Sequence, residues 1–425
     1  MAAGVGVIGA GTVGGGVIRI LLSNASEIST RSSVDVSLVH VADKDLRQLD
    51  GLDLPGVTVS EDATALIEDP SVDVVCELIG GIDPARKFIL AALGAKKHVV
   101  TANKMLLACH GPELCRAAIA NNVELRYEAA VAGGIPIIKA LREGLSGNRI
   151  RFVCGILNGT CNYILSRMTY EGLEFGNVLE QAIESGFAET PPDLDIEGHD
   201  TAHKCQIIAS LCFCTEVDLD DIYVEGVTKV THADVAYARE MGYLIKLLAI
   251  VRDRDGEIEA RVHPALVPED HLLASVRNEF NAVYVKSDAA DATLYYGRGA
   301  GRLPTASAVV ADIVDIARRG DASPPPPFLY GDRRTVRPIG SLEGRYYLRL
   351  TTLDRPGVLG KVCTILGGHG VSIASCIQKE EDDEGLPVHV VLMTHETLES
   401  SLRDALEEID RLEFIREATH VLRVL

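Results

Sequence analysis

The segment GVGVIGAGTVGGGVIRILL, residues 4–22, decides the fold class of this 425-residue chain. Its apolar start predicts a short strand, which leads through a GxGxxG turn into a helix with one apolar face. In this context the first glycine permits a tight turn, the second lets the backbone approach a pyrophosphate, and the third lets helix and strand pack closely. The unpaired N–H groups of the helix start also suit an anion. We therefore expect a dinucleotide cofactor to contact Gly9, Gly11, Thr12, Val13 and Gly14.

A second predicted strand, residues 34–41, ends close to Asp43, the acid expected to bind the adenosine ribose. Asp43 follows the last glycine of the turn at more than the usual spacing of about 20 residues, and the polar stretch 23–33 accounts for the extra length. Asp43 favours NAD because its charge repels a 2′-phosphate, whereas Lys44 and Arg47 are placed to receive one. The sequence leaves both NAD and NADP open.

Further strands are predicted at 72–79 and 98–101, with a helix at 84–93 between them. Alternating strands and helices predict a Rossmann-type, doubly wound parallel sheet, in which ligands bind at the carboxyl ends of the strands. Two of these ends carry chemistry: Gly80 offers bare backbone to a nicotinamide ring, and Lys104 places a cation at a strand end.

Composition excludes several classes of partner. The formal net charge of −20 argues against binding nucleic acid or an anionic membrane, which require clustered lysine and arginine. The uncharged N-terminal stretch is too rich in glycine for a membrane helix and lacks the basic start of a signal peptide. Ten cysteines without a CxxC pair indicate reduced thiols, so we expect a cytoplasmic protein.

The segment ETPPDLDIEGHDTAHK, residues 189–204, carries the densest polar pattern. Asp200 and Lys204 stand at i and i+4 of a predicted helix, and their stripe continues into Ile207, Ile208 and Leu211. A surface pair of this kind contributes only about 0.3–0.5 kcal/mol. A partly buried lysine oriented by an aspartate can instead donate a proton, because desolvation brings its pKa toward neutrality. Spacing alone leaves a catalytic pair and a structural ion pair equally open.

A zinc hydrolase is a rival hypothesis for the same segment. The pattern HDTAH places His199 and His203 on one helical face, as in the HExxH zinc motif. That motif uses glutamate as the general base, and Asp200 is one methylene shorter. No third ligand follows at close range, so the zinc interpretation is disfavoured.

Six segments, in order and at family-like spacing, resemble homoserine dehydrogenases along nearly the whole chain. They are VIGAGTVGGGVI (7–18), HVVTANK (98–104), EAAVAGGIPII (128–138), GILNGTCNYIL (155–165), ESGFAETPPDLDIEGHDTAHK (184–204) and YGRGAGRLPTASAVVADIVDIA (296–317). The resemblance implies an NAD(P)-dependent interconversion of homoserine and aspartate 4-semialdehyde, in the biosynthesis of threonine, methionine and isoleucine.

The resemblance also implies roles for single residues. Lys204 would donate a proton to the carbonyl oxygen as hydride reaches the carbon, or remove it in the reverse direction, and Asp200 would hold Lys204 in place. Lys104 resembles a family lysine that lies near cofactor and substrate. Implied substrate contacts are Glu189 for the ammonium, Asp195 for the hydroxyl end, and Asp200, Gly159 and Thr160.

Two glycines and one loop complete the implied site. Gly186 and Gly301 fall in loops that line the cofactor cleft, whereas Phe187 replaces a tyrosine common in the family, so any role of that hydroxyl is absent. The loop after residue 127 resembles the family's monovalent-cation site, whose hard oxygen ligands suit sodium or potassium. Its ligands would be the Glu128 carboxylate and the backbone carbonyls of Val131, Gly133 and Ile135.

The chain is expected to divide into three domains. A dinucleotide-binding domain covers 1–130, an α+β catalytic and dimerisation domain covers 131–303, and the helix 304–320 packs back on the first domain. The proline-rich stretch 321–345 predicts a semi-rigid linker.

Residues 346–425 predict the order βαββαβ of a ferredoxin-like sandwich. The turn DRPGVL, residues 354–359, resembles that of an ACT domain, in which Gly357 would let an amino-acid effector approach. The family suggests threonine as this effector and a homodimer or homotetramer as the assembly. Two alternatives remain: a purely structural dimerisation domain, and a cofactor-binding sensor without catalysis.

Overall fold

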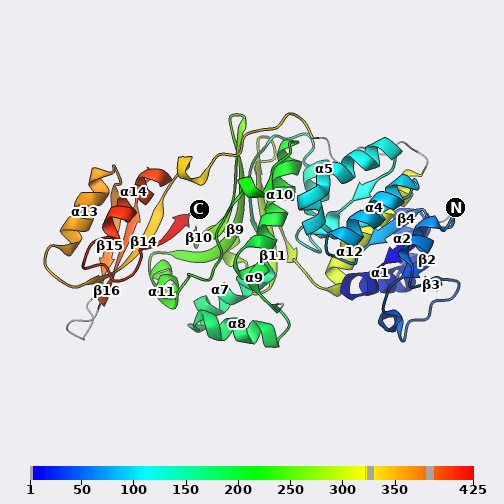
Figure 1. Cartoon of the computed structure of the whole chain (residues 1–425), viewed down its shortest axis with the longest axis horizontal. Coiled ribbons are helices and arrows are strands. Elements are labelled where there is room, and N and C mark those ends of the chain that lie inside the picture. The colour runs from blue at the N-terminus through cyan, green and yellow to red at the C-terminus, as the bar shows by residue number, and fades with distance from the viewer. Residues whose placement is uncertain (1–2, 189, 321, 323–329, 380–386) are drawn as a thin grey trace.

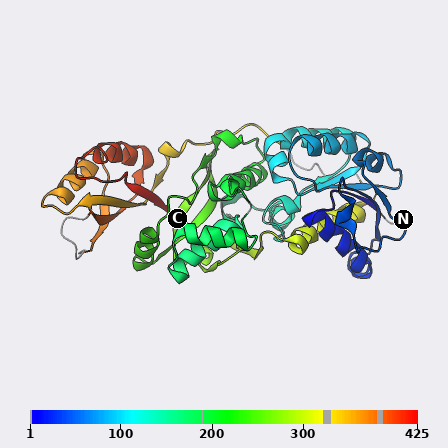
Figure 2. The ribbon, with the colours of Figure 1, turned by 60° about the horizontal axis from the view of Figure 1, so that its bottom comes forward.

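The computed structural model describes residues 3–188, 190–320, 322, 330–379 and 387–425. The chain forms three lobes in a row, with the N-terminus in one outer lobe and the C-terminus beside the middle lobe (Figure 1). The row persists when the molecule is turned (Figure 2). None of the described helices is long and apolar enough to cross a membrane.

The first lobe is a doubly wound parallel sheet with the strand order β3-β2-β1-β4-β5-β6. Two separate apolar clusters cover its two faces. The strands are β1 (Ala3–Ile8), β2 (Val36–Ala42), β3 (Thr58–Ser60), β4 (Val74–Glu77), β5 (His98–Thr101) and β6 (Leu125–Arg126), and the helices are α1 (Thr12–Ser23), α2 (Ala25–Ser32), α3 (Ala63–Glu68), α4 (Asp83–Gly94) and α5 (Lys104–Asn121). The predicted Rossmann-type sheet is confirmed; β3, β6, α2, α3 and α5 are additions to the predicted elements.

Helix α12 (Arg302–Arg319) returns from the middle lobe and packs against α1 of the first lobe. The two helices approach closely at Gly16, where an added Cβ would lie 2.6 Å from the carbonyl oxygen of Arg302 and 2.8 Å from the Cβ of Ala306. Glycine at this position therefore permits the contact that ties the two lobes together.

The middle lobe is built on a mixed sheet that continues into the third lobe. Its strands are β7 (Ile150–Ile156), β9 (Tyr243–Arg254), β10 (Glu257–Pro268), β11 (Phe280–Ser287) and β12 (Ala292–Arg298), with the short β8 (Tyr223–Val224) beside β10. Its helices are α6 (Ile137–Lys139), α7 (Gly159–Glu171), α8 (Phe175–Glu184), α9 (Asp193–Ile196), α10 (His199–Phe213) and α11 (His232–Glu240).

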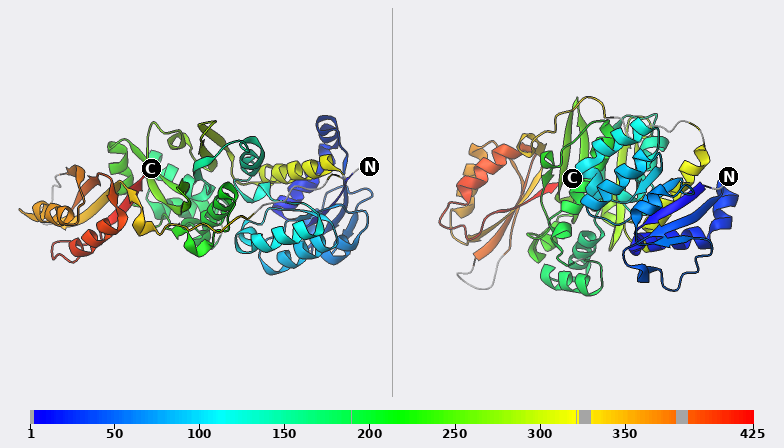
Figure 3. Two further views of the ribbon diagram at one scale, coloured as in Figure 1. Left: turned by 90° about the horizontal axis from the view of Figure 1, so that it is seen from above. Right: turned by 45° about the vertical axis from the view of Figure 1, so that its right-hand side comes forward.

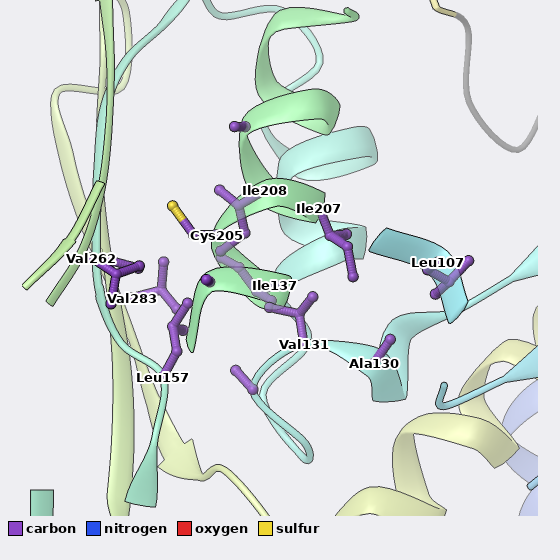
Figure 4. Packing of buried hydrophobic residues seen from close by; sticks show 14 of the residues in the cluster. Leu107, Ala130, Val131, Ile137, Leu157, Cys205, Ile207, Ile208, Val262 and Val283 are labelled. Atoms are coloured by element: carbon purple, nitrogen blue, oxygen red, sulfur yellow. The ribbon is translucent and has the colours of Figure 1, made fainter. Parts of the chain in front are cut away.

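Helix α10 is the central element of this lobe, because it is buried from Asp200 to Leu211. Figure 4 shows Cys205 and Ile208 of α10 on the side of the sheet residue Val262, whereas Ile207 points toward Leu107 of α5. The helix thus packs on the middle sheet and on the first lobe at once, which holds its polar N-terminal turn at the junction of the two.

The third lobe has the order β14 (Tyr346–Leu353), α13 (Val358–Gly368), β15 (Ile373–Gln378), β16 (Pro387–Thr394), α14 (Glu399–Ile409) and β18 (His420–Val424), with β17 (Thr397–Leu398) pairing outside the main sheet with β13 (Glu343–Gly344). Both long helices lie on one face of the sheet β18-β14-β16-β15 (Figure 3). This is the predicted ferredoxin-like arrangement.

Strand β18 joins the third lobe to the middle one. It pairs antiparallel with β14 and, through Ala265 with Arg423 and Leu266 with Val424, parallel with β10. On one side of this junction Asp234 of α11, fully buried, accepts hydrogen bonds from Arg349 at 2.7 and 3.2 Å and from the Tyr347 hydroxyl at 3.0 Å. A continuous sheet and a buried ion pair therefore couple the two lobes.

The described end of the expected linker is bound to the middle lobe. Thr335 O accepts the N–H of Ile258 at 2.9 Å, and the N–H of Arg337 returns a bond to Ile258 O at 2.8 Å. The backbone oxygen of Asp332 accepts the Thr215 hydroxyl at 3.0 Å. This part of the connection runs as an extended strap along β10.

Candidate active site

The glycine turn at the end of β1 has the features that a pyrophosphate requires. Gly9 has φ +95°, and an added Cβ on Gly11 would meet no atom within 4 Å, so the space beside the turn is open. Helix α1 has no side-chain cap, which leaves N–H groups of its first turn for an anion. Thr12 and Val13 stand in that turn. These residues fit a dinucleotide, and the set remains a prediction.

Changing Gly14 to alanine should abolish binding of NAD(P). An added Cβ would lie 1.8 Å from the carbonyl oxygen of Gly9, so α1 must move away from its strand. Titration of the protein with NADPH, followed by fluorescence, measures the loss. The control Gly94→Ala places a Cβ with no atom within 4 Å at the end of α4 and should bind as the wild type does. Equal affinity of both variants would contradict the assignment of the turn.

Asp43 lies beside this turn, immediately after β2. Its Oδ2 accepts the N–H of Ala10 at 2.5 Å, and its Oδ1 accepts the N–H of Asp45 at 2.8 Å. The carboxylate is therefore held at the edge of the turn, where an adenosine ribose is expected. Arg47 pairs with Asp45 and its side chain is 85% exposed.

Glu77 is a residue of the cofactor edge that the sequence analysis missed. It is fully buried, and its carboxylate accepts N–H groups of Ile79 at 3.0 Å and Gly80 at 3.3 Å and the Thr101 hydroxyl at 2.7 Å. Burial raises the pKa of Glu77. The carboxylate thus shapes the loop at Gly80, whose φ is +72°. The available signal was an acid that ends an apolar strand directly before this loop.

A lysine–aspartate–lysine group lies where the first and middle lobes meet. Lys204 Nζ donates to Asp200 Oδ2 at 2.6 Å, and Lys104 Nζ, from the start of α5, lies 3.0 Å from Asp200 Oδ1. Lys204 is 8% exposed and also donates to the carbonyl of Leu157 at 2.7 Å. The structure thus adds Lys104, from the dinucleotide-binding lobe, to the pair of Asp200 and Lys204 on α10.

Asn158, the N-cap of α7, connects this group to a second carboxylate. Its Nδ2 donates to Asp200 Oδ2 at 2.9 Å and to Asp195 Oδ1 at 2.7 Å. The Thr160 hydroxyl lies 3.2 Å from Asp195 Oδ2. Gly159 opens the same helix, where an added Cβ would lie 2.8 Å from the carbonyl oxygen of Glu279, so this tight position requires glycine.

The pKa values of Asp200 and Asp195 are shifted in opposite directions. Burial disfavours the charge of Asp200, but Lys204 and Lys104 outweigh it and hold the pKa of Asp200 well below its ordinary value. Burial raises the pKa of Asp195, and the hydrogen bond from Asn158 does not offset it. Asp200 is therefore held between two lysines that favour its charge, whereas the burial of Asp195 disfavours its charge.

The two predicted loop glycines flank helices. Gly186 follows α8 with φ +72°, and Gly301 precedes α12 with φ +125°. The Phe187 ring is 42% exposed and stacks on Tyr163, with ring centroids 4.8 Å apart. Glu189, predicted to bind the substrate ammonium, lies outside the described residues.

The loop expected to hold a cation is buried and tightly curled. Ala132 and Gly133 have φ of +56° and +53°, and an added Cβ on Gly133 would lie 2.3 Å from the carbonyl oxygen of Gly299. The Glu128 carboxylate accepts the N–H groups of Ile138 and Lys139, each at 2.8 Å. Its oxygens have further lone pairs for a hard cation, so one carboxylate and several carbonyls are available here.

His199 and His203 do not gather a third ligand. Across the described residues, no group of three or more histidine, cysteine, aspartate or glutamate side chains is arranged to hold a metal ion. Burial lowers the pKa of His203, which is 9% exposed. The zinc interpretation therefore finds no support from this part of the chain.

Comparisons with known proteins cover all three lobes. Family models match at residues 9–128 (homoserine dehydrogenase, NAD binding domain), 136–314 (homoserine dehydrogenase) and 346–414 (ACT domain). Homoserine dehydrogenases of Pseudomonas aeruginosa and Bacillus subtilis are 43% and 37% identical, each match covering 99% of this chain and 98% of the relative. A crystal structure of a homoserine dehydrogenase from Thiobacillus denitrificans matches with a TM-score of 0.93 at 43% identity, covering 100% of this chain and 98% of that one.

The dinucleotide sheet and the matched family models define an NAD(P)-dependent oxidoreductase with an ACT domain. This class excludes both the zinc hydrolase and the sensor without catalysis. The matches extend from end to end at identities well above 30%. The chain belongs to the homoserine dehydrogenase family.

Proposed function

We propose that the protein interconverts L-homoserine and L-aspartate 4-semialdehyde, in the pathway to threonine, methionine and isoleucine. The observation that carries the proposal is the hydrogen bonding of Lys204. Two of its three N–H groups are bound, by Asp200 and the carbonyl of Leu157, and no third partner occurs among the described residues. The third N–H is left for the oxygen of a substrate.

The proposed roles follow from this geometry. A bound nicotinamide supplies the hydride in one direction and accepts it in the other. Lys204 donates its proton to the carbonyl oxygen, or removes one from the hydroxyl, and the low dielectric of its buried site strengthens its attraction for developing negative charge. Asp200 positions Lys204 and Lys104 and lies at the substrate. Asp195, Gly159, Thr160 and Glu189 are proposed to contact the substrate.

An absorbance assay tests this function directly. Purified protein mixed with homoserine and NAD⁺ or NADP⁺ should give growth in absorbance at 340 nm, and initial rates with each cofactor establish its preference. The same protein without homoserine is the control. No growth with either cofactor, at any homoserine concentration, would overturn the proposed reaction.

We also propose that Glu128 and the carbonyls of Val131, Gly133 and Ile135 bind sodium or potassium. The cation would brace the loop that packs against Gly299, next to Gly301 and α12. The support is a buried carboxylate whose hydrogen-bond partners among the described residues are two backbone N–H groups.

Sodium should stabilise the wild type but not the Glu128→Gln variant. A cation that binds only the folded protein adds about 2.7 kcal/mol when it stands at a hundredfold excess over its Kd. Thermal unfolding in choline chloride, with sodium or potassium then added, measures the shift without any assay of activity. Glu143→Gln removes a nearby exposed acid and should keep the shift. An equal shift in all three proteins would show that the loop binds no cation.

We propose that the ACT lobe confers feedback inhibition by an amino acid, with threonine as the effector. Gly357 supports this, because it has φ +90° at the turn into α13 and an added Cβ there would meet no atom within 4 Å.

We further propose a homodimer or homotetramer in the cytoplasm. The exposed apolar side chains of Leu272 and Tyr296 are compatible with such an interface, and mass photometry measures the assembly.

A further inference from the structure

A cavity of about 170 Å³ lies at the junction of the middle and third lobes, away from the lysine–aspartate group. One wall is β9 and β10, and the other walls are the β13–β17 pair and the end of β18. The volume corresponds to five or six water molecules at about 30 Å³ each. The charged side chains that line it are Arg252, Arg261, Arg345, Arg423, Glu343 and Glu396, together with Glu399.

Of the four arginines, Arg423 has the most complete ion pairing among the described residues. Arg423 donates to Glu399 at 2.6 and 2.9 Å and to Glu225 at 2.8 Å, so its charge is fully compensated. Because Arg423 is already paired, a ligand in this cavity would be bound by the other charged side chains.

The guanidinium groups on β9 and β10 share a single carboxylate. Glu259 accepts hydrogen bonds from Arg254 at 2.6 Å and Arg261 at 3.2 Å, and it lies 4.0 Å from Arg252. The Arg252 side chain donates no hydrogen bond among the described residues, although it forms this long ion pair with Glu259 and lies over the Phe152 ring, and the buried Nε of Arg261 has no partner there. Burial, with the neighbouring guanidinium groups, lowers the pKa of both Arg252 and Arg261 despite Glu259. This wall has more positive charge than it can compensate.

Negative charge without a partner faces the same space. Glu343 and Glu396 are exposed, and neither forms an ion pair among the described residues, although Arg345 also lines the cavity. A cavity with excess positive charge on one wall and unpaired carboxylates on another is complementary to a ligand that carries both charges.

We infer that this cavity binds a small zwitterion, a free amino acid, with its carboxylate on Arg252 and Arg261 and its ammonium on Glu343 and Glu396. A carboxylate there would gain charge-assisted hydrogen bonds from the Arg252 side chain, which donates none among the described residues, and from the unpartnered Nε of Arg261. The inference deepens the proposed regulation, on which it rests, by placing the effector between the ACT lobe and the catalytic sheet instead of at the Gly357 turn.

The position explains how binding would reach the catalytic lobe. The cavity has walls from both lobes, so a ligand in it favours one relative placement of the two. Arg252 and Arg261 lie on β9 and β10, and α10 with Asp200 and Lys204 packs on those strands. A change in the packing of β9 and β10 would therefore affect the lysine–aspartate group directly, without involving the turn at Gly357.

Isothermal titration of the full chain tests the inference, with glycine, alanine, serine, threonine and aspartate as probes. At least one should bind, whereas ethanolamine, propionate and inorganic phosphate should bind at least about tenfold more weakly, a loss of about 1.4 kcal/mol. Arg252→Gln and Glu396→Gln should each weaken binding at least about tenfold. Arg411→Gln, an exposed arginine of the third lobe, should bind as the wild type does.

The following results would overturn the inference that the cavity binds an amino acid. Tight binding of phosphate that survives Glu396→Gln would make the cavity a plain oxyanion site. Loss of amino-acid binding in Gly357→Val, with full binding in both cavity variants, would place the effector at the turn and leave the proposed regulation standing. If no probe binds in the titration but an amino acid still inhibits the protein, the cavity is excluded as the effector site and the proposed regulation stands. Absence of both binding and inhibition would end the regulation itself, independently of the dehydrogenase assay.

Discussion

Replacing Lys204 by alanine should lower kcat at least about a hundredfold, while NAD(P) still binds. Proton transfer by a positioned side chain contributes about 10²–10⁴-fold to a rate, and Lys204 is a buried amine that pairs with Asp200 and has one N–H without a partner among the described residues. The cofactor turn lies on another lobe and should be unaffected. Steady-state rates with saturating homoserine, together with NADPH titration, measure both quantities.

Lys97→Ala is the matched control for this prediction. Lys97 is another lysine that donates to backbone carbonyls, those of Asp69 and Val72, but it lies in the first lobe away from the lysine–aspartate group. Its variant should keep kcat within a few-fold of the wild type. A Lys204→Ala enzyme with wild-type kcat would disprove the proton-transfer role and leave the pair with Asp200 as a structural contact.

Replacing Asp234 by alanine should lower the free energy of unfolding by about 3–5 kcal/mol. Removing one member of a buried ion pair costs this much because the other charge stays buried without a partner. Here the stranded groups are the Arg349 guanidinium, 7% exposed, and the Tyr347 hydroxyl. Urea denaturation of both proteins at pH 7 gives the difference.

The contribution of Asp234 also has a direction in pH. Burial disfavours its charge, but His420 and Arg349 outweigh it and hold the pKa of Asp234 well below its ordinary value. A carboxyl group whose folded-state pKa is depressed stabilises above its unfolded pKa, about 3.9, and loses that stabilisation as the pH falls below it. The gap between wild type and Asp234→Ala should therefore shrink below about pH 4. The exposed Asp404→Ala serves as control, and an equal loss of stability in both variants would refute the argument.

The sequence predicted the elements whose pattern is local. The GxGxxG turn lies between β1 and α1, and the stripe from Asp200 to Leu211 is a buried helix. The pair β9–β10 was not predicted, because YLIKLLAIV at 243–251 is apolar apart from Lys246 instead of alternating, and periodicity cannot separate such a strand from a buried helix.

The parts of the site that the sequence did not predict are contacts between segments that are distant in the chain. Nothing in the spacing of residues 104 and 200 indicates that Lys104 reaches Asp200, since the contact depends on how α5 and α10 pack. The role of Asn158 between two carboxylates is equally tertiary.

The pairing of β18 with β10 has a consequence for solubility. Strand β10 would otherwise present unpaired N–H and C=O groups at residues 265–266, and an open strand edge is a template for adding strands of other molecules. The closing strand occupies that edge with its own backbone and is itself shielded on its far side by β14. A chain that ends before residue 420 would lack β18. It would therefore expose the edge of β10 in the middle lobe and become prone to aggregation.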